Sequence, residues 1–205
     1  MKKLKVFWNF DKEERWLNEM AAQGQLISRA GLRYAFTPVS PSAGVVRVDY
    51  RPSMSEEDFA DYVRLFRDAG WEHRAGARRG GGQYFVSYST EADADIFSDA
   101  ESKAQRYRRS IAAHTALLIP LLVVVVLLWS NGSLLTAPQE WYVTPGLWDK
   151  QGAEFVGSFA FESLFVLFRV GGPMLLLGVC LYSLAAVIYQ STLYNRASAQ
   201  SEPAI

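Results

Sequence analysis

Two long apolar runs in the second half of the chain limit the folds open to it more than any other feature. The first, IAAHTALLIPLLVVVVLLW at residues 111–129, has 19 residues without a formal charge, and a helix of that length can cross a hydrocarbon core of about 30 Å. Its twelve Leu, Ile and Val residues favour insertion by about 5 kcal/mol, from which Pro120 and His114 subtract a part. We therefore expect a membrane-spanning helix here.

The second apolar run, LFVLFRVGGPMLLLGVCLYSLAAVIY at residues 164–189, carries one charge, Arg169. An arginine at the bilayer centre costs about 2.5–3.5 kcal/mol, but close to a helix end its long stem can reach the interface. The alternative is an intramembrane pair of Arg169 with Glu162. We expect a second span at 164–189, with Glu162 and Arg169 as its polar candidates.

Charge divides the chain into a polar and an apolar part. Of the 42 Lys, Arg, Asp and Glu residues, 34 precede Ile111, and 18 of these are basic and 16 acidic. This near-neutral balance argues against a protein built mainly to grip nucleic acid. We expect a domain at residues 1–107, a membrane hairpin at 108–190 with its loop at 130–163, and a short polar tail at 191–205.

The distribution of basic residues predicts the orientation in the membrane. Four bases precede the first span and Arg196 follows the second, whereas the connecting loop holds Lys150 alone; the four are Lys103, Arg106, Arg108 and Arg109. By the positive-inside rule the N-terminal domain and the tail are cytoplasmic, which predicts a multi-pass protein of the plasma membrane. The loop then faces outward, with aromatic residues as candidate interfacial anchors: Trp141, Tyr142, Trp148, Phe155 and Phe159.

Periodicity in the polar part predicts alternating strands and helices. Apolar residues alternate at 4–10, 32–37 and 46–51, which favours strands, and a last strand or strand pair is expected within 71–89. Apolar residues recur at helical spacing in 11–24 and 55–70. Asp11 with Glu14, and Ser55 with Asp58, have the spacing of capping boxes, and the remaining charges of the first helix are expected on its solvated side.

The resulting order of strand, helix, strand, strand, helix, strand predicts an α+β, ferredoxin-like split βαβ domain. In such a fold 32–37 and 46–51 form a hairpin, and both helices cover one face of one antiparallel sheet. Alternation places six residues on the open face as a candidate partner surface: Lys5, Phe7, Arg33, Arg47, Asp49 and Arg51. A protein partner, self-association or anionic lipid suits this mixture better than RNA, because Asp49 lies in its middle and the sequence has no RNP-like aromatic string.

Chemistry-bearing motifs are few. The two histidines, His73 and His114, form neither a metal-ligand cluster nor a Ser-His-Asp pattern, and Cys180 is the single cysteine, in an apolar run. The loop GARRGGG at 76–82, with Arg78 and Arg79, lacks the lysine and Ser/Thr of a P-loop and is more typical of a hairpin tip than of a phosphate cradle. We therefore expect neither catalysis nor a cofactor or metal site.

Several segments together resemble one family. FWNFDKEERWLNEMAAQGQL, LRYAF, VRVDYR, DYVRLFRDAGWEH, GGQYF and DIFSDAESKAQRY are similar to segments of the bacterial membrane-protein family called domain of unknown function 2812. The resemblance covers roughly residues 3–107 and supplies no catalytic residues. It implies a cytoplasmic domain tied to the inner membrane and often encoded beside a PadR-like transcriptional repressor, hence a regulated envelope or stress response.

These observations predict a membrane-anchored, non-catalytic signalling or regulatory protein whose cytoplasmic domain binds a protein partner. The alternative is an accessory subunit of a membrane transporter, in which Glu162 and Arg169 contact other transmembrane helices. Besides the bilayer, the expected partner is thus a cytoplasmic regulator or a membrane protein.

Overall fold

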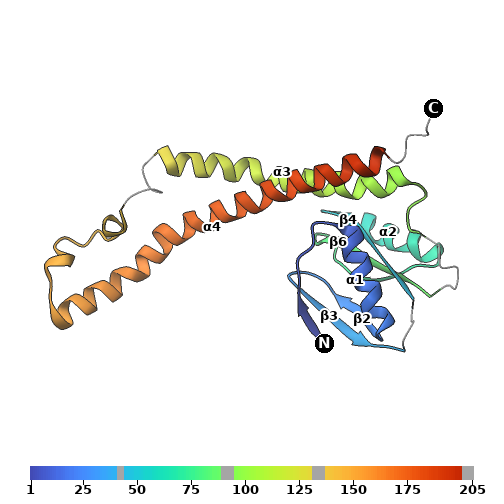
Figure 1. The fold of residues 1–205 in the computed structure, drawn as a ribbon, viewed down its shortest axis with the longest axis horizontal. Coiled ribbons are helices and arrows are strands. Elements are labelled where there is room, and N and C mark those ends of the chain that lie inside the picture. Colours follow the sequence, from blue (N-terminus) through green and yellow to red (C-terminus); the bar gives the residue numbers. More distant parts are fainter. Residues whose placement is uncertain (41–43, 89–94, 131–136, 200–205) are drawn as a thin grey trace. The chain divides into compact units, whose positions relative to one another are not determined.

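A computed structural model of the chain describes residues 1–40, 44–88, 95–130 and 137–199 (Figure 1). It divides into two compact units, residues 1–113 with 186–205 and residues 114–185. The first is an α+β domain and the second consists of apolar helix with a short loop. The first unit thus extends past residue 107, where the predicted domain ends, as far as residue 113. The predicted tail at 191–205 belongs to the first unit, and its residues 200–205 lie outside the described part.

The domain is built from two consecutive β-α-β-β halves. The first half is β1 (Lys2–Leu4), α1 (Phe10–Ala22), β2 (Gln25–Arg29) and β3 (Arg33–Pro38). The second is β4 (Val45–Arg51), α2 (Glu56–Asp68), β5 (Glu72–Ala75) and β6 (Gly81–Ser87). Each half forms its own three-stranded antiparallel sheet, in the orders β1-β3-β2 and β4-β6-β5. The split βαβ motif, in which a third strand lies between two helix-connected strands, thus occurs twice.

Local details repeat between the halves as well. In each, the N-cap side chain, Asn9 or Ser55, accepts a hydrogen bond from the amide three residues later, and a glycine with positive φ, Gly24 or Gly70, follows the helix. β2 and β5 each carry a register shift against their partner strand and run into the tripeptide Arg-Ala-Gly, at 29–31 and 74–76. The domain is therefore a duplicated unit, a feature that periodicity alone did not indicate.

This arrangement corrects two predictions about the sheet. The predicted hairpin between 32–37 and 46–51 is wrong, because β3 pairs with β1 and β2 whereas β4 pairs with β6. The two helices also do not share one face of one sheet. α1 packs against Val46 and Val48 on one side of β4, while Tyr62 of α2 packs on Phe85 and bonds Asp49 on the other side. Residues 5–9 are not strand, so the first strand is shorter than predicted.

Two hydrophobic clusters follow from this layering. The larger lies between α1 and both sheets and is centred on fully buried residues such as Leu17, Leu26 and Val48. The smaller lies under α2 around Phe85, whose ring is 4.3 Å from that of Phe66 and 5.5 Å from that of Tyr62. Ser55 is the N-cap of α2 as predicted, and its hydroxyl accepts from the Asp58 amide and donates to the Asp58 carboxylate. Asp11 is not the N-cap of α1, which is Asn9.

Both apolar runs are helical. α3 (Ala100–Ser130) contains the whole first run, and α4 (Gly152–Ala199) contains the second; each is long and apolar enough to cross a membrane. Short 3-10 turns, η1 (Pro138–Trp141) and η2 (Leu147–Asp149), precede α4. The helix also continues past the second run, and Leu193 and Tyr194 pack against the larger cluster of the domain. The polar tail is thus helical as far as Ala199.

Candidate functional site

The first turns of α3 enter the domain through a buried arginine. Arg106 is fully buried, and its Nη1 donates to Oε1 of Glu14 at 2.5 Å and to the carbonyl oxygen of Val48 at 2.9 Å. Its Nη2 donates to Oδ1 of Asp11 at 2.6 Å. One guanidinium therefore ties α3 to α1 and β4 at once.

The surroundings of Arg106 explain how the domain tolerates a buried cation. The rings of Phe10, Phe97 and Tyr107 lie within 5.4–5.5 Å of its guanidinium carbon, a range in which cations interact favourably with aromatic faces. Burial lowers the pKa of Arg106, but the charges of Glu14 and Asp11 outweigh it and leave the pKa raised. Buried charges need such pairing, because an unpaired one costs several kcal/mol.

A second arginine of α3 binds the other side of the same strand. Asp49 is buried and accepts hydrogen bonds from the Tyr62 hydroxyl at 2.8 Å and from Arg51 Nε at 3.2 Å. Nη2 of Arg109 also donates to Asp49, and its Nε donates to the carbonyl oxygen of Tyr50 at 2.6 Å. Burial, and then the charge of Asp49, raise the pKa of the Tyr62 hydroxyl, so it stays a donor.

These contacts form one unit, which we call the α3 clamp. It consists of two arginines and a tyrosine of α3 with three acidic partners: Arg106, Tyr107, Arg109, Asp11, Glu14 and Asp49. Because residues three apart share a helix face, Arg106 and Arg109 grip β4 from one side of α3. The clamp holds the start of α3 to α1 and β4 and, through Tyr62, reaches α2.

The sequence contained this clamp but periodicity assigned its members other roles. Spacing predicts that Glu14 completes a capping box, and the bases before the first span indicate the orientation in the membrane. In the structure Arg108 is exposed and Lys103 pairs with Asp95 at 2.8 Å, whereas Arg106 and Arg109 are taken up by the domain. The 3-residue spacing of the two arginines, facing a helix rich in acids, is the one signal that could have indicated it.

Next to the clamp lies a buried carboxyl without a cationic contact of its own among the described residues. Glu13 is 3% exposed, and its Oε1 accepts hydrogen bonds from the hydroxyls of Tyr34 at 2.6 Å and Tyr84 at 2.7 Å. Burial raises the pKa of Glu13 against the lowering effect of both tyrosines. Of the charges predicted on the solvated side of the first helix, Lys12, Arg15 and Glu19 are exposed. Glu13 is not, because it points into the domain, as Glu14 does.

The raised pKa of Glu13 gives a pH prediction. Between its ordinary value of 4.5 and the higher folded value, the folded chain binds more protons than the unfolded chain, so the stability due to Glu13 is lost as pH rises. Glu13→Gln removes this loss. We expect its melting temperature relative to the native chain to increase from about pH 4 to about pH 8, measured by thermal unfolding in detergent. The exposed Glu19→Gln is the control, and a constant difference for Glu13→Gln would contradict the assignment.

The six residues of the predicted partner surface do not share one open face. Lys5 and Arg33 are exposed, while Phe7 packs on Trp16 with 5.3 Å between ring centroids. Arg47, Asp49 and Arg51 lie on the side of β4 that α2 covers. The placement of Asp49 on the surface is wrong, since it is 1% exposed.

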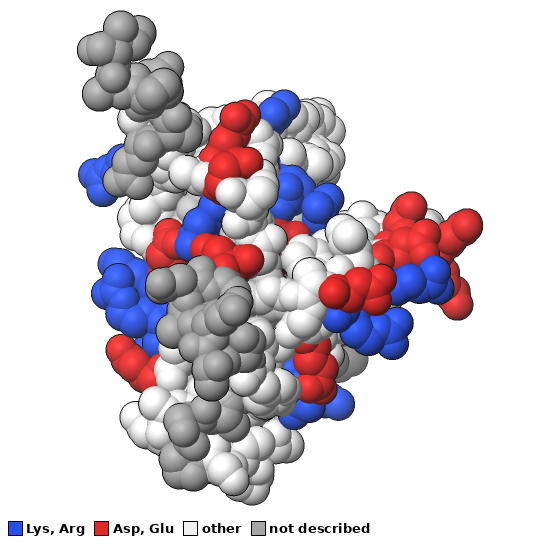
Figure 2. Space-filling model, turned by 90° about the vertical axis from the view of Figure 1, so that its right-hand side faces the viewer, with Lys and Arg blue, Asp and Glu red and all other residues white. Residues whose placement is uncertain are grey.

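Arg47 and Arg51 are also engaged. Arg47 lies 3.5 Å from Asp95, and Arg51 pairs with Asp49 and lies 5.4 Å from the Tyr62 ring. On the face shown in Figure 2, basic and acidic side chains are interspersed, in keeping with the equal numbers of basic and acidic residues in the chain.

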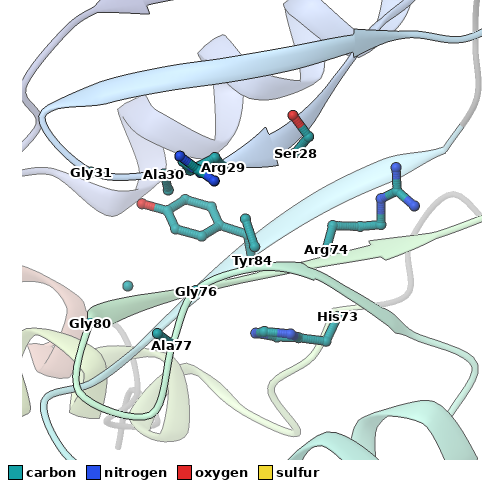
Figure 3. A pocket seen from close by; sticks show the side chains of 12 residues that line it. Ser28, Arg29, Ala30, Gly31, His73, Arg74, Gly76, Ala77, Gly80 and Tyr84 are labelled. Atoms are coloured by element: carbon teal, nitrogen blue, oxygen red, sulfur yellow. The ribbon is translucent and has the colours of Figure 1, made fainter.

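A hollow of about 430 Å³ lies where the two Arg-Ala-Gly segments meet. Figure 3 shows Ser28–Gly31 on one side and His73–Ala77 on the other, with the Arg74 side chain directed away from Tyr84. Its polar groups are largely engaged: Arg74 pairs with Glu72 at 2.9 Å, His73 Nε2 bonds Gln83 Oε1 at 2.9 Å, and the Tyr84 hydroxyl bonds Glu13. Burial lowers the pKa of His73 and favours its neutral form.

The glycine-arginine loop at 76–82 lines this hollow with Gly76, Ala77, Gly80 and Gly82, but its two arginines are not part of the lining. Arg78 lies 3.5 Å from Glu56, and its carbonyl oxygen accepts a hydrogen bond from Met54, so it serves to hold the loop beside α2. Gly76 and Gly81 have positive φ angles of 118° and 77°, as a tight turn into β6 requires. Arg79 is exposed.

A second hollow, of about 450 Å³, lies between α2 and β5. Its lining is mainly apolar and includes Phe59, Val63, Trp71 and Tyr88, with Arg67 and Glu72 among its polar residues. We call it the α2 groove.

The polar pair of the second unit is organised by its own loop. Both Glu162 oxygens accept from the Thr144 amide, at 2.9 and 3.2 Å, and Oε1 also accepts from that of Val143. Arg169 Nη1 donates to the carbonyl oxygen of Trp141 at 2.6 Å and lies 4.0 Å from Glu162. The two side chains are thus near neighbours, but each has a backbone partner at shorter range.

The predicted interfacial aromatics also gather in this unit. Tyr142 stacks on Phe159 at 5.0 Å, and Trp148 lies 5.3 Å from Tyr142 and 6.2 Å from Phe155. These four aromatic side chains therefore pack on one another. Of the predicted loop, residues 131–136 are outside the described part.

Among the described residues no group of three or more His, Cys, Asp and Glu could hold a metal ion, and Cys180 is a buried free thiol. The described residues therefore form packing contacts and ion pairs, and the largest polar network among them is the clamp that holds α3 to the domain.

The fold and the clamp define a class of protein: an α+β domain whose polar network grips the start of a long apolar helix. Residues 9–119 match the family model described as Protein of unknown function (DUF2812), and since this is more than half of the chain, the protein belongs to that family. The matched region begins at the N-cap of α1 and ends within α3, so it includes the whole clamp. No curated protein and no solved structure matches the chain.

Proposed function

We propose that the protein is a membrane-anchored, non-catalytic signalling or regulatory protein of the bacterial inner membrane. In this proposal α3 and α4 cross the bilayer at 111–129 and 164–189, both chain ends are cytoplasmic, and the domain binds a protein partner. The duplicated split βαβ halves support a relationship to ferredoxin-like folds by duplication. The resemblance to proteins encoded beside PadR-like repressors supports a regulatory role in envelope stress.

One observation carries the proposal: α3 is a single helix whose first turns are held by the clamp and whose remainder is apolar. A rotation or shift of the membrane part is transmitted along a continuous helix, and here it acts directly on Arg106 and Arg109. Buried ion pairs tolerate little displacement, since losing one partner costs about 3–5 kcal/mol. We therefore expect two states of α3: one in which Arg106 and Arg109 keep their ion pairs with the domain, and one in which a movement of α3 has broken these pairs.

The partner surface follows from what the clamp touches. α2 is connected to the clamp by the bond from Tyr62 to Asp49, and its other side lines the α2 groove. We propose that an apolar side chain of a cytoplasmic protein binds in this groove, and that the state of the clamp sets how α2 presents it. Exposed apolar hollows with polar residues at their edges are typical of such contacts.

A second candidate, an accessory subunit of a membrane transporter, is favoured by Arg169. Its side chain is 44% exposed although Glu162 and Trp141 lie close, and polar groups in apolar helices commonly bond neighbouring helices. In this case the function lies in the second unit, and the domain is a scaffold.

Inserting alanines into α3 tests the first proposal against the second. One alanine after Ala113 turns the following helix by about 100°, whereas four return it to within about 40° of its native phase. Partners are captured by crosslinking in cells and identified by mass spectrometry. We expect a soluble regulator that is lost with one alanine and recovered with four. A partner set that ignores both insertions contradicts coupling through α3, and integral membrane partners lost in Arg169→Leu support the subunit instead.

A further inference from the structure

The N-terminal edge of the domain combines exposed cations with exposed large apolar side chains. β1, the segment after it and the β2–β3 turn supply one apolar side chain each, since Leu4 is 74%, Val6 55% and Leu32 78% exposed. Leu4 pairs directly with Arg33 across the β1–β3 ladder, so apolar and cationic groups alternate on one patch. Leu32 directly precedes Arg33 in the chain, so it lies close to Leu4 as well. Exposed large apolar side chains that lie close to cations are typical of interaction surfaces.

The cations of this edge are available for an external partner. Lys2, Lys5, Arg29 and Arg33 are exposed and have no ion pair among the residues that the structure describes. Lys2, Arg29 and Arg33 line one hollow of about 490 Å³. The ammonium group of Lys5 lies over the rings of Phe7 and Trp16, at 4.9 and 4.7 Å, which holds it in place. Three cations around one hollow suit an anionic group such as a phosphate.

The same edge adjoins the end of the second apolar run. The Trp8 ring lies 6.2 Å from that of Tyr189, the last residue of that run, and the carbonyl oxygen of Trp8 accepts a hydrogen bond from Gln190 at 3.2 Å. Trp8 is four residues beyond Leu4 in the chain. If 164–189 spans the bilayer, Trp8 therefore lies close to the lipid headgroups, and β1 is a few residues away from it in the chain.

We propose that this edge, formed by Lys2, Leu4, Lys5, Val6, Leu32 and Arg33, binds the anionic headgroups of the membrane that anchors the chain. The cations pair with lipid phosphates while Leu4, Val6 and Leu32 enter the boundary with the acyl chains, the combination found in peripheral membrane contacts. Anchoring by the spans keeps the local lipid concentration high, so a weak contact suffices. The inference rests on the proposed membrane insertion.

Site-directed spin labelling of the full chain tests the proposal. In a Cys180→Ser background, nitroxide is attached at Leu32→Cys, and its accessibility to oxygen and to a water-soluble nickel complex is measured in vesicles. We expect a shift toward the lipid-buried values in vesicles with phosphatidylglycerol. The shift is lost in pure phosphatidylcholine, at about 1 M salt, where the Debye length falls to about 3 Å, and in the variant with Lys5→Glu and Arg33→Glu.

Two further labels separate the possible failures. Leu65→Cys on α2, where the native side chain is 67% exposed, reports water in every vesicle. Leu122→Cys in the first apolar run reports the bilayer interior in every vesicle. A Leu32 label that stays in water while the Leu122 label is in lipid overturns the inference alone and leaves the edge for an acidic protein. A Leu122 label in water overturns the membrane anchoring and the inference with it. A Leu32 label that ignores lipid charge overturns the headgroup contact.

Discussion

Arg106→Met is expected to lower the free energy of unfolding of the domain by about 3–5 kcal/mol, because it leaves Glu14 buried without its cation. Glu14 is 6% exposed and keeps one amide donor, that of Val48 at 3.0 Å. Amide exchange of β4 and β6, followed by mass spectrometry on the full chain in detergent, reports this opening. Since each 1.4 kcal/mol is a factor of ten, exchange through global opening should accelerate by at least about 100-fold.

Two variants make this result specific to the clamp. Arg108→Met removes the same charge two residues further along α3 from an exposed position, and we expect a change within about 0.5 kcal/mol. Adding Glu14→Met to Arg106→Met removes the orphaned carboxylate and should recover part of the loss, as replacement of whole buried ion pairs by apolar groups often does. Equal exchange in Arg106→Met and Arg108→Met would refute the clamp.

The size of this effect bears on the signalling proposal. A clamp that contributed nothing to stability could be displaced without consequence, and the domain would not register a movement of α3. A contribution of a few kcal/mol is comparable to the difference between two populated conformations of a switching protein. The free energy that the clamp contributes to the stability of the domain then sets how strongly a movement of α3 can change the conformation of the domain.

The sequence predicted the positions of helices and strands better than it predicted which strands pair with each other. The bounds of α1 and α2 follow from residue spacing to within two residues. Both apolar runs are helical, but α3 and α4 extend well beyond them. Pairing did not follow, because β3 and β4 are adjacent in sequence and yet join different sheets. The duplication was hidden because the halves share topology, caps and one tripeptide but few core residues.

The buried charges were missed for a related reason. Amphipathic periodicity assigns every charge to the solvent, and this holds for Lys12 and Glu19 of α1. It fails for Glu14, whose cation Arg106 is 92 residues away in sequence, and for Asp49, whose partner Arg109 is 60 residues away. A pattern within one helix cannot indicate a partner supplied by another. The bases next to an apolar run were, in addition, already explained by membrane orientation, so nothing prompted a second role.

The second large effect is expected for Asp49→Ala, which should destabilise the domain by about 2–3 kcal/mol. The change deprives Arg109, Arg51 and the Tyr62 hydroxyl of a shared acceptor. Tyr62 is 9% exposed, so its hydroxyl has little water to replace the carboxylate. The loss of stability should appear as faster amide exchange in β4 and β6. It should also appear in α2, because the Asp49 carboxylate of β4 accepts the hydrogen bond from Tyr62 of α2.

Asp61→Ala is the matched control, since Asp61 lies on α2 but its side chain is 67% exposed and pairs with Arg64 at 3.6 Å. Exposed pairs contribute about 0–1 kcal/mol, so exchange in this variant should stay close to native. Tyr62→Phe with Asp49→Ala then separates the two sides of the carboxylate. If Tyr62→Phe restores part of the stability, the orphaned hydroxyl accounts for that part and Arg109 for the rest. Unchanged exchange in Asp49→Ala would mean that Asp49 does not link α3 to α2, and coupling from the clamp to the α2 groove would lose its route.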